Sequence, residues 1–156
     1  MYLLNMDRCN YPNPVSVICD VDLQRGQLLQ IEGMAQNNIW LDNEEDFEAY
    51  KVALADADAE KKDLLIHTTV PFSYNETDTE YDFYLKAGKV GRGHYVNTGD
   101  EYTFDAELVE GVSAVGEEVQ LAGDGKMKLL ADGNAIGKVV RIYNFGGNPS
   151  VMIRFY

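Results

Sequence analysis

Short runs of apolar residues that alternate with polar ones recur along the chain, and the last two runs are the clearest. Residues 139–143 (VVRIY) and 151–155 (VMIRF) are rich in β-branched and aromatic side chains, and residues 145–150 (FGGNPS) separate them. Gly-Gly and Asn-Pro are turn sequences, so this stretch predicts a β-hairpin with a loop of about five or six residues. A terminal strand this apolar should be paired, either within its own sheet or against a neighbouring molecule.

The same pattern predicts strands over much of the remaining sequence. Tyr50, Val52 and Leu54 alternate with Ala49, Lys51 and Ala53, which is the period of two that a half-buried strand shows. Asp-Gly at residues 124–125 is the expected turn of a second hairpin. Residues 55–63 lack an apolar stripe, so we expect one short helical turn there at most, or a loop. Further strands are predicted over residues 15–21, 27–32, 39–41, 64–70, 83–85, 102–104, 115–121 and 126–130, and a surface loop over residues 73–82.

Many short strands at regular spacing, with little helix, indicate a mainly β fold, either a small β-barrel or a β-sandwich. A chain of 156 residues can bury a core without disulfide bonds. We therefore predict one β-rich domain over residues 1–156, preceded by an N-terminal arm over about residues 1–13. Residues 23–29 and 124–129 resemble each other weakly, so two β-lobes, about 1–100 and 101–156, are the alternative arrangement.

The charge of the chain restricts its partners. Thirteen Lys and Arg residues against 26 Asp and Glu residues give a net charge of −13, and no run of three basic residues occurs. Binding to nucleic acid depends on cationic contacts with phosphates. No apolar run reaches the roughly 18–20 residues that cross a bilayer. We therefore expect neither nucleic acid nor membrane as a partner.

Residues that could carry chemistry are few. His67 and His94 are the only histidines, and His67, between an apolar strand and a proline, is expected to be structural. Glycines at 88, 91 and 93 match no phosphate-binding spacing, so a positive φ or the close approach of another backbone explains them better. Cys9 and Cys19 form no disulfide framework, and reduced thiols are expected. We predict no catalytic residues, no metal site and no cofactor, and hence a protein that is not an enzyme.

The layout resembles the auxiliary capsid proteins, called cement or decoration proteins, of tailed bacteriophages. The similarity is one of pattern and runs from about Leu23 to Tyr156. The segments that carry it are residues 23–29 (LQRGQLL), 65–67 followed by Pro71, 86–92 (KAGKVGR), 115–119 (VGEEV), 125–127 (GKM) and 137–140 (GKVV).

This resemblance implies a β-barrel-like virion protein without enzymatic activity. Such a protein is made in the cytoplasm of the host bacterium and is located on the outer capsid surface of the virion. Its expected partner is the major capsid protein, whose subunits it bridges to stabilise the head, and copies of itself are a second partner to consider. The family has no catalytic residues to transfer to this chain.

Two groups of residues are the expected contacts with the capsid. The first is an N-terminal arm that is unusually apolar, and the second is a set of cations on an acidic chain. An edge strand packed on its own domain is the alternative interpretation of the arm. The predicted partner-binding residues are Met1, Tyr2, Leu3, Leu4, Met6, Arg8, Lys89 and Arg92.

Two other functions remain open from the sequence. The first is another phage virion component of the tail, the baseplate or the base of a head fibre. The second is a soluble β-module that binds carbohydrate or protein. A carbohydrate module should present a concave aromatic patch, whereas a virion component should be found in purified particles at a fixed ratio to the major capsid protein.

Overall fold

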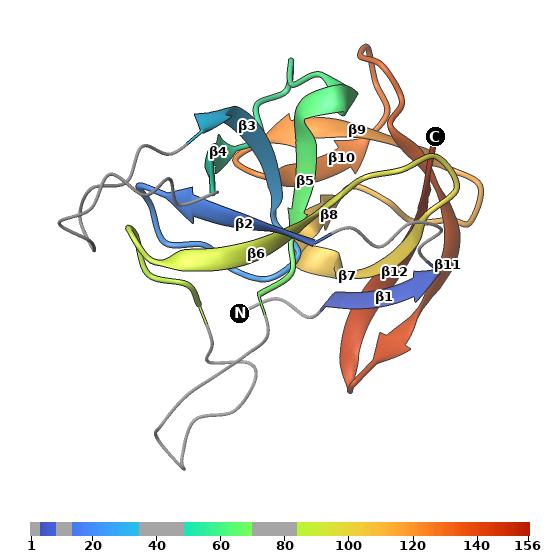
Figure 1. Cartoon of the computed structure of the whole chain (residues 1–156). Coiled ribbons are helices and arrows are strands. Elements are labelled where there is room, and N and C mark those ends of the chain that lie inside the picture. Colours follow the sequence, from blue (N-terminus) through green and yellow to red (C-terminus); the bar gives the residue numbers. More distant parts are fainter. Residues whose placement is uncertain (1–3, 9–13, 35–48, 70–83) are drawn as a thin grey trace, which may run out of the picture.

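The computed structural model describes residues 4–8, 14–34, 49–69 and 84–156 (Figure 1). Within these ranges the predicted mainly β fold is confirmed, because the chain forms a five-stranded closed barrel and a seven-stranded sheet. The helical segments of the described residues are two short 3-10 turns, η1 (Lys61–Asp63) and η3 (Ala106–Leu108). The strand predicted over residues 39–41 and the loop over residues 73–82 lie outside the described residues.

The barrel is formed by the first half of the chain. Its strand order is β2-β4-β3-β5-β6, with β2 and β4 parallel and the other neighbours antiparallel. Val17, Leu29, Val52 and Leu65 lie inside it with less than 2% of their surface exposed. The strand predicted around Val52 is confirmed, but its alternation holds only in part, because Ala49 is as buried as Val52. The strands are β2 (Pro14–Cys19), β3 (Leu28–Met34), β4 (Tyr50–Leu54), β5 (Leu64–His67) and β6 (Val90–Tyr95).

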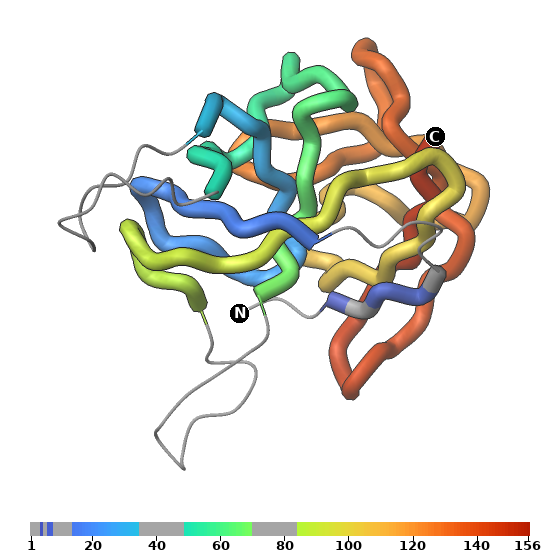
Figure 2. Tube along the Cα trace, viewed as in Figure 1, coloured from blue at the N-terminus to red at the C-terminus, as the bar shows by residue number. Residues whose placement is uncertain are grey.

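The seven-stranded sheet has the order β1-β7-β12-β11-β9-β10-β8. Its C-terminal strand β12 lies between β7 and β11, so the expected pairing of the last strand takes place within the sheet. In Figure 2 the blue N-terminal strand and the red C-terminal hairpin lie on the same side of the molecule. The strands are β1 (Leu4–Arg8), β7 (Glu101–Asp105), β8 (Val109–Glu110), β9 (Glu118–Gly123), β10 (Lys126–Leu129), β11 (Gly137–Phe145) and β12 (Asn148–Phe155).

The two predicted hairpins are present, but one of their turns is shorter than expected. Gly146 and Gly147 alone connect β11 to β12, with φ values of 59° and 86°. Two consecutive residues with positive φ give a tight turn whose twist matches that of the strands, so the strands continue to the glycines. The expected longer loop is therefore wrong. The Asp124-Gly125 turn is confirmed, with φ values of 52° and 71°.

Strand β6 was not expected, because its first half is rich in glycine. The glycine at 88 lies in a turn with a φ of 75°. A Cβ atom at Gly91 would overlap the side chain of Leu85 and lie 2.5 Å from Thr69 Oγ1. Positive φ and close approach both explain these glycines. At Gly91 the neighbours are side chains, whereas at Gly93 an added Cβ would lie 3.3 Å from the backbone oxygen of Ile66, as expected. The strand predicted over residues 83–85 contributes only the isolated bridge between Leu85 and Leu23 among the described residues.

The turn between β9 and β10 joins the sheet to the barrel through its backbone. The N–H of Leu28 donates to the carbonyl of Gly125 at 2.9 Å, and the N–H of Gly125 donates to the carbonyl of Ala55 at 3.2 Å. The N–H of Ala55 in turn donates to the carbonyl of Leu28 at 2.9 Å. One apolar core is continuous across this junction and includes Ile66 of the barrel and Phe104 of the sheet. The N-terminal strand β1 also belongs to the sheet and not to the barrel. Whether the chain is one domain or two lobes stays a prediction.

The side chain of His67 connects the end of β5 to the loop before β3 by a hydrogen bond. Its imidazole is fully buried, and its Nδ1–H donates to the carbonyl of Gln24 at 2.8 Å. Its Nε2 lies 2.6 Å from Thr69 Oγ1 and accepts the proton of that hydroxyl. Burial lowers the pKa of His67 to about 4, so the ring is neutral at pH 7. These contacts agree with the structural role expected for this histidine.

The junction predicts that Gly125→Ala destabilises the protein more than Gly147→Ala. Both glycines have positive φ, which costs an alanine about 1–2 kcal/mol. At Gly147 nothing lies within 4 Å of the added Cβ, whereas at Gly125 the Cβ would lie 2.8 Å from the carbonyl oxygen of Leu28. Urea unfolding should show an additional loss of about 1–3 kcal/mol for Gly125→Ala. Equal losses for the two variants would contradict the role of this junction.

The buried imidazole predicts that acid destabilises the protein through His67. Its folded pKa of about 4 lies below the ordinary value of 6.5, so the unfolded chain binds more protons between these pH values. The free energy of unfolding should therefore fall by about 3 kcal/mol through this group as the pH falls from 7 to 4. Urea unfolding of the natural protein and of His67→Gln across this range measures the difference, because the carboxylates are common to both. Parallel pH profiles would refute this assignment.

Candidate binding surface

The predicted N-terminal arm forms the edge strand of the chain's own sheet in its described part. Strand β1 pairs antiparallel with β7, with Leu4 opposite Phe104 and Met6 opposite Tyr102. Leu4 is 5% exposed and Met6 is half-buried, so both contribute to the core of the sheet. This arrangement matches the alternative interpretation of the arm. Residues 1–3 lie outside the described residues, and binding of a partner by the arm stays a prediction.

The predicted cations do not all lie near one another. Lys89 immediately precedes β6 and Arg92 lies within it, so both belong to the barrel, and both side chains are exposed. The backbone N–H of Arg92 donates to Thr69 Oγ1 at 2.9 Å. Arg8 lies instead in β1, where its backbone stands opposite that of Glu101 at the edge of the sheet. The predicted contact residues are thus divided between the barrel and the seven-stranded sheet.

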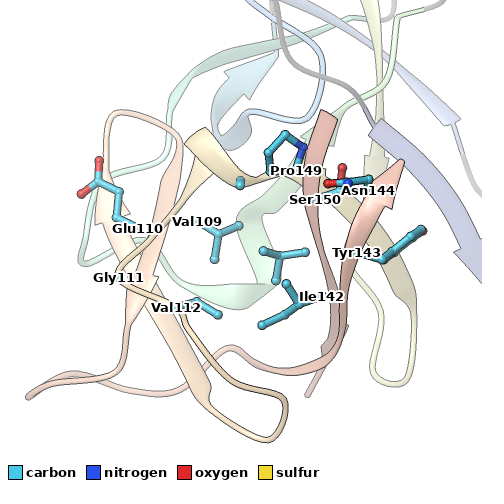
Figure 3. A pocket seen from close by; sticks show the side chains of 11 residues that line it. Val109, Glu110, Gly111, Val112, Ile142, Tyr143, Asn144, Pro149 and Ser150 are labelled. Atoms are coloured by element: carbon cyan, nitrogen blue, oxygen red, sulfur yellow. The ribbon is translucent and has the colours of Figure 1, made fainter. Parts of the chain in front are cut away.

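An apolar groove that sequence analysis did not identify lies between the β11–β12 hairpin and residues 106–112. Its volume is about 530 Å³. Figure 3 shows the side chains of Val109, Val112 and Ile142 pointing toward one another across this groove. Tyr143 points away from the groove, and the carboxylate of Glu110 points outward. Ile142 is 42% exposed, which is high for an isoleucine in a strand.

The groove is bordered by an open strand edge. Strand β9 pairs with β11 only at Gly137 and Lys138. Val139 is still held from the same side, because its N–H donates to the carbonyl of Glu117 and its carbonyl accepts from Gly116, both at 2.8 Å. A bulge then follows between Val139 and Arg141, and residues 142–145 pair with β12 alone among the described residues. Half of β11 therefore forms an edge next to apolar side chains.

The opposite face of the hairpin is occupied by contacts within the chain. The hydroxyl of Thr103 donates to Asp7 Oδ2 at 2.6 Å and lies 2.8 Å from the hydroxyl of Tyr143. The guanidinium carbon of Arg141 lies 3.9 Å from the centre of the Tyr143 ring. Arg154 pairs with Glu101 on the same face. Because these polar groups already have partners, the groove face is the better candidate for contact with another molecule.

The described residues offer little else that could bind a ligand. No group of three or more His, Cys, Asp or Glu side chains placed to hold a metal ion is found among them. Cys19 is a buried free thiol, and Cys9 lies outside the described residues. No helix in these parts of the chain is long and apolar enough to cross a bilayer.

Comparison with known proteins finds a likeness in structure. No protein family and no curated protein match the sequence. The fold resembles a solved structure described as the head fiber gp8.5 N base in bacteriophage phi29, with 13% sequence identity and a TM-score of 0.49, over 94% of this chain and 95% of that chain. That protein is a phage virion component. At a TM-score below one half, the likeness assigns no function to this chain.

Proposed function

We propose that this chain is a structural protein of a tailed-phage virion that attaches to the outside of the head. The observation that carries the proposal is the contact surface of the seven-stranded sheet, where the open half of β11 meets the groove of Val109, Val112 and Ile142. An exposed strand edge beside apolar side chains favours contact with another protein chain. The sequence pattern shared with auxiliary capsid proteins supports the virion assignment.

The charge of the chain supports attachment outside the capsid shell. A net charge of −13 is repelled by the phosphates of packaged DNA, and it is tolerated on the outer surface. The cations Lys89 and Arg92 are exposed on the barrel, where they can face carboxylates of a capsid subunit. The major capsid protein is therefore the proposed partner, and the virion surface is the proposed location.

The barrel and the seven-stranded sheet offer separate contacts that one capsid junction could engage together. A typical stable interface buries about 1,600 Å² in total. Contacts made by the barrel and by the sheet on neighbouring subunits strengthen each other, because binding of one raises the effective concentration of the other. The continuous core between Ile66 and Phe104 supports this arrangement, since it joins the barrel to the sheet.

The proposal has two forms. As a cement protein, the chain would bridge capsid subunits and resist the pressure of the packaged DNA. As a head-fibre base, the role that its description gives to the phi29 protein, it would attach an external projection to the head. A carbohydrate-binding module fits less well, because the groove is lined by Val109, Val112 and Ile142, and Tyr143 points away from it.

Deletion of the gene from the phage distinguishes these forms. Purified natural particles should contain the protein at a fixed ratio to the major capsid protein. If the protein is a cement, heads without it should form but release DNA on mild heating. If it is a fibre base, such heads should keep their DNA and lose external projections in electron micrographs. Absence of the protein from purified natural particles would refute both forms.

Charge reversal tests the contact proposed for the barrel. The double variant Lys89→Glu, Arg92→Glu should bind deletion heads about tenfold more weakly than the natural protein in a co-sedimentation titration. The double variant Lys61→Glu, Lys62→Glu is the matched control, because it changes the net charge equally on another exposed part of the barrel. Equal weakening by both would show that overall charge, and not the position of the cations, matters.

A further inference from the structure

The open half of β11 has unpaired backbone groups that point away from the sheet. The two-residue turn makes Phe145 and Asn148 a hydrogen-bonded pair, and pairs alternate along antiparallel strands. Ile142 and Asn144 therefore direct their N–H and C=O groups away from β12. Pro149, which has no N–H, lies opposite Asn144, where no donor toward β11 is needed.

Residues 113–117, beside this edge, are held in place by hydrogen bonds that do not involve residues 142–145. The carboxylate of Glu117 accepts hydrogen bonds from the N–H groups of Ser113 and Ala114 at 2.7 and 3.0 Å. These bonds lower the pKa of the Glu117 carboxyl, so they persist at neutral pH. Val115, at the tip of this turn, is 62% exposed. The edge and its apolar surroundings are thus preformed for a partner.

The charges around the groove indicate the chemistry of that partner. Glu110 is the one carboxylate among the residues that line the groove, and it lies 3.7 Å from Lys126 Nζ in an exposed ion pair. Residues 105–118 carry four further carboxylates and no Lys or Arg, so the segment as a whole is acidic. Arg141 of the hairpin lies over the Tyr143 ring. The partner should therefore be cationic. A second copy of this chain would instead bring another charge of −13 to the same place.

We propose that the outer edge of β11 binds an extended, basic segment of another protein as an added strand. The backbone of the segment pairs with Ile142 and Asn144, and its apolar side chains lie over the groove beside Val112. Lys or Arg side chains that alternate with them face Glu110 and the other carboxylates of residues 105–118 at the rim of the groove. Main-chain hydrogen bonds provide the affinity, and the groove and the rim provide the selectivity. This inference rests on the proposed function only in that it describes how the sheet would attach to the head.

Amide hydrogen exchange of the purified protein tests the added strand directly. The probe is a synthetic peptide of about seven residues in which Lys and Val alternate. Without peptide, the amide protons of Ile142 and Asn144 should exchange quickly, because no strand covers them. A saturating amount of peptide should slow their exchange about tenfold or more, and leave the amides of β1 unchanged.

Two control peptides separate strand addition from simple attraction. The first carries N-methyl groups on alternate residues, which removes backbone donors but keeps the charge and the apolar side chains. The second carries Glu in place of Lys. Neither should slow exchange at Ile142 or Asn144. Equal protection by a control peptide, no protection by the Lys-Val peptide, or protection that grows with protein concentration alone would overturn the proposal.

A variant adds an independent check. Asn144→Pro removes one outward N–H of the edge and should abolish the protection at Ile142, whereas Asn134→Pro, in the exposed connection before β11, should not. The peptide series uses the natural protein, so it remains decisive if a proline variant fails to fold. Particle binding is not measured in this experiment. If the peptide fails to protect the edge, the proposed attachment to the head still stands. If the protein is absent from particles, the proposed addition of a strand still stands.

Discussion

The backbone junction at Gly125 determines how the rest of the molecule is arranged. A turn at the tip of β9 and β10 exchanges hydrogen bonds with Leu28 and Ala55 of the barrel, and the apolar core is continuous beneath it. Such a close approach requires a residue without a side chain, because an added Cβ would lie 2.8 Å from a carbonyl oxygen. With β9 held at the barrel, the far half of β11 pairs with β12 alone in the part of the chain that the structure describes.

This constraint explains why the molecule has an open edge where a β-protein usually protects one. Closed barrels have no edges, and the first half of the chain uses that solution. The sheet cannot close, because β9 leaves β11 after Lys138 and a bulge follows Val139. The exposed Ile142 then lies next to unpaired backbone groups. An acidic net charge keeps such a surface from pairing with itself and leaves it available to a partner of opposite charge.

The sequence was sufficient to predict the strands and turns that are specified by their own residues. The strand around Val52 and the turn at Asp124-Gly125 depend on local residues, and both are present. Strand β6 could not be predicted, because Gly91 is required by the side chains of Leu85 and Thr69, which are neighbours only in the folded chain. The groove could not be predicted either. It depends on where β9 departs from β11, and the bulge that moves Ile142 toward the groove leaves no mark in the hydrophobic pattern.

Electron microscopy of the assembled particle, at a resolution that traces strands, would show which surface of the protein meets the head. We expect density for this protein on the outside of the head, with the outer edge of β11 against a neighbouring polypeptide and the groove beside Ile142 covered. Particles that lack the protein, or a bound protein in which the edge of β11 faces solvent and the contact lies elsewhere, would refute this attachment.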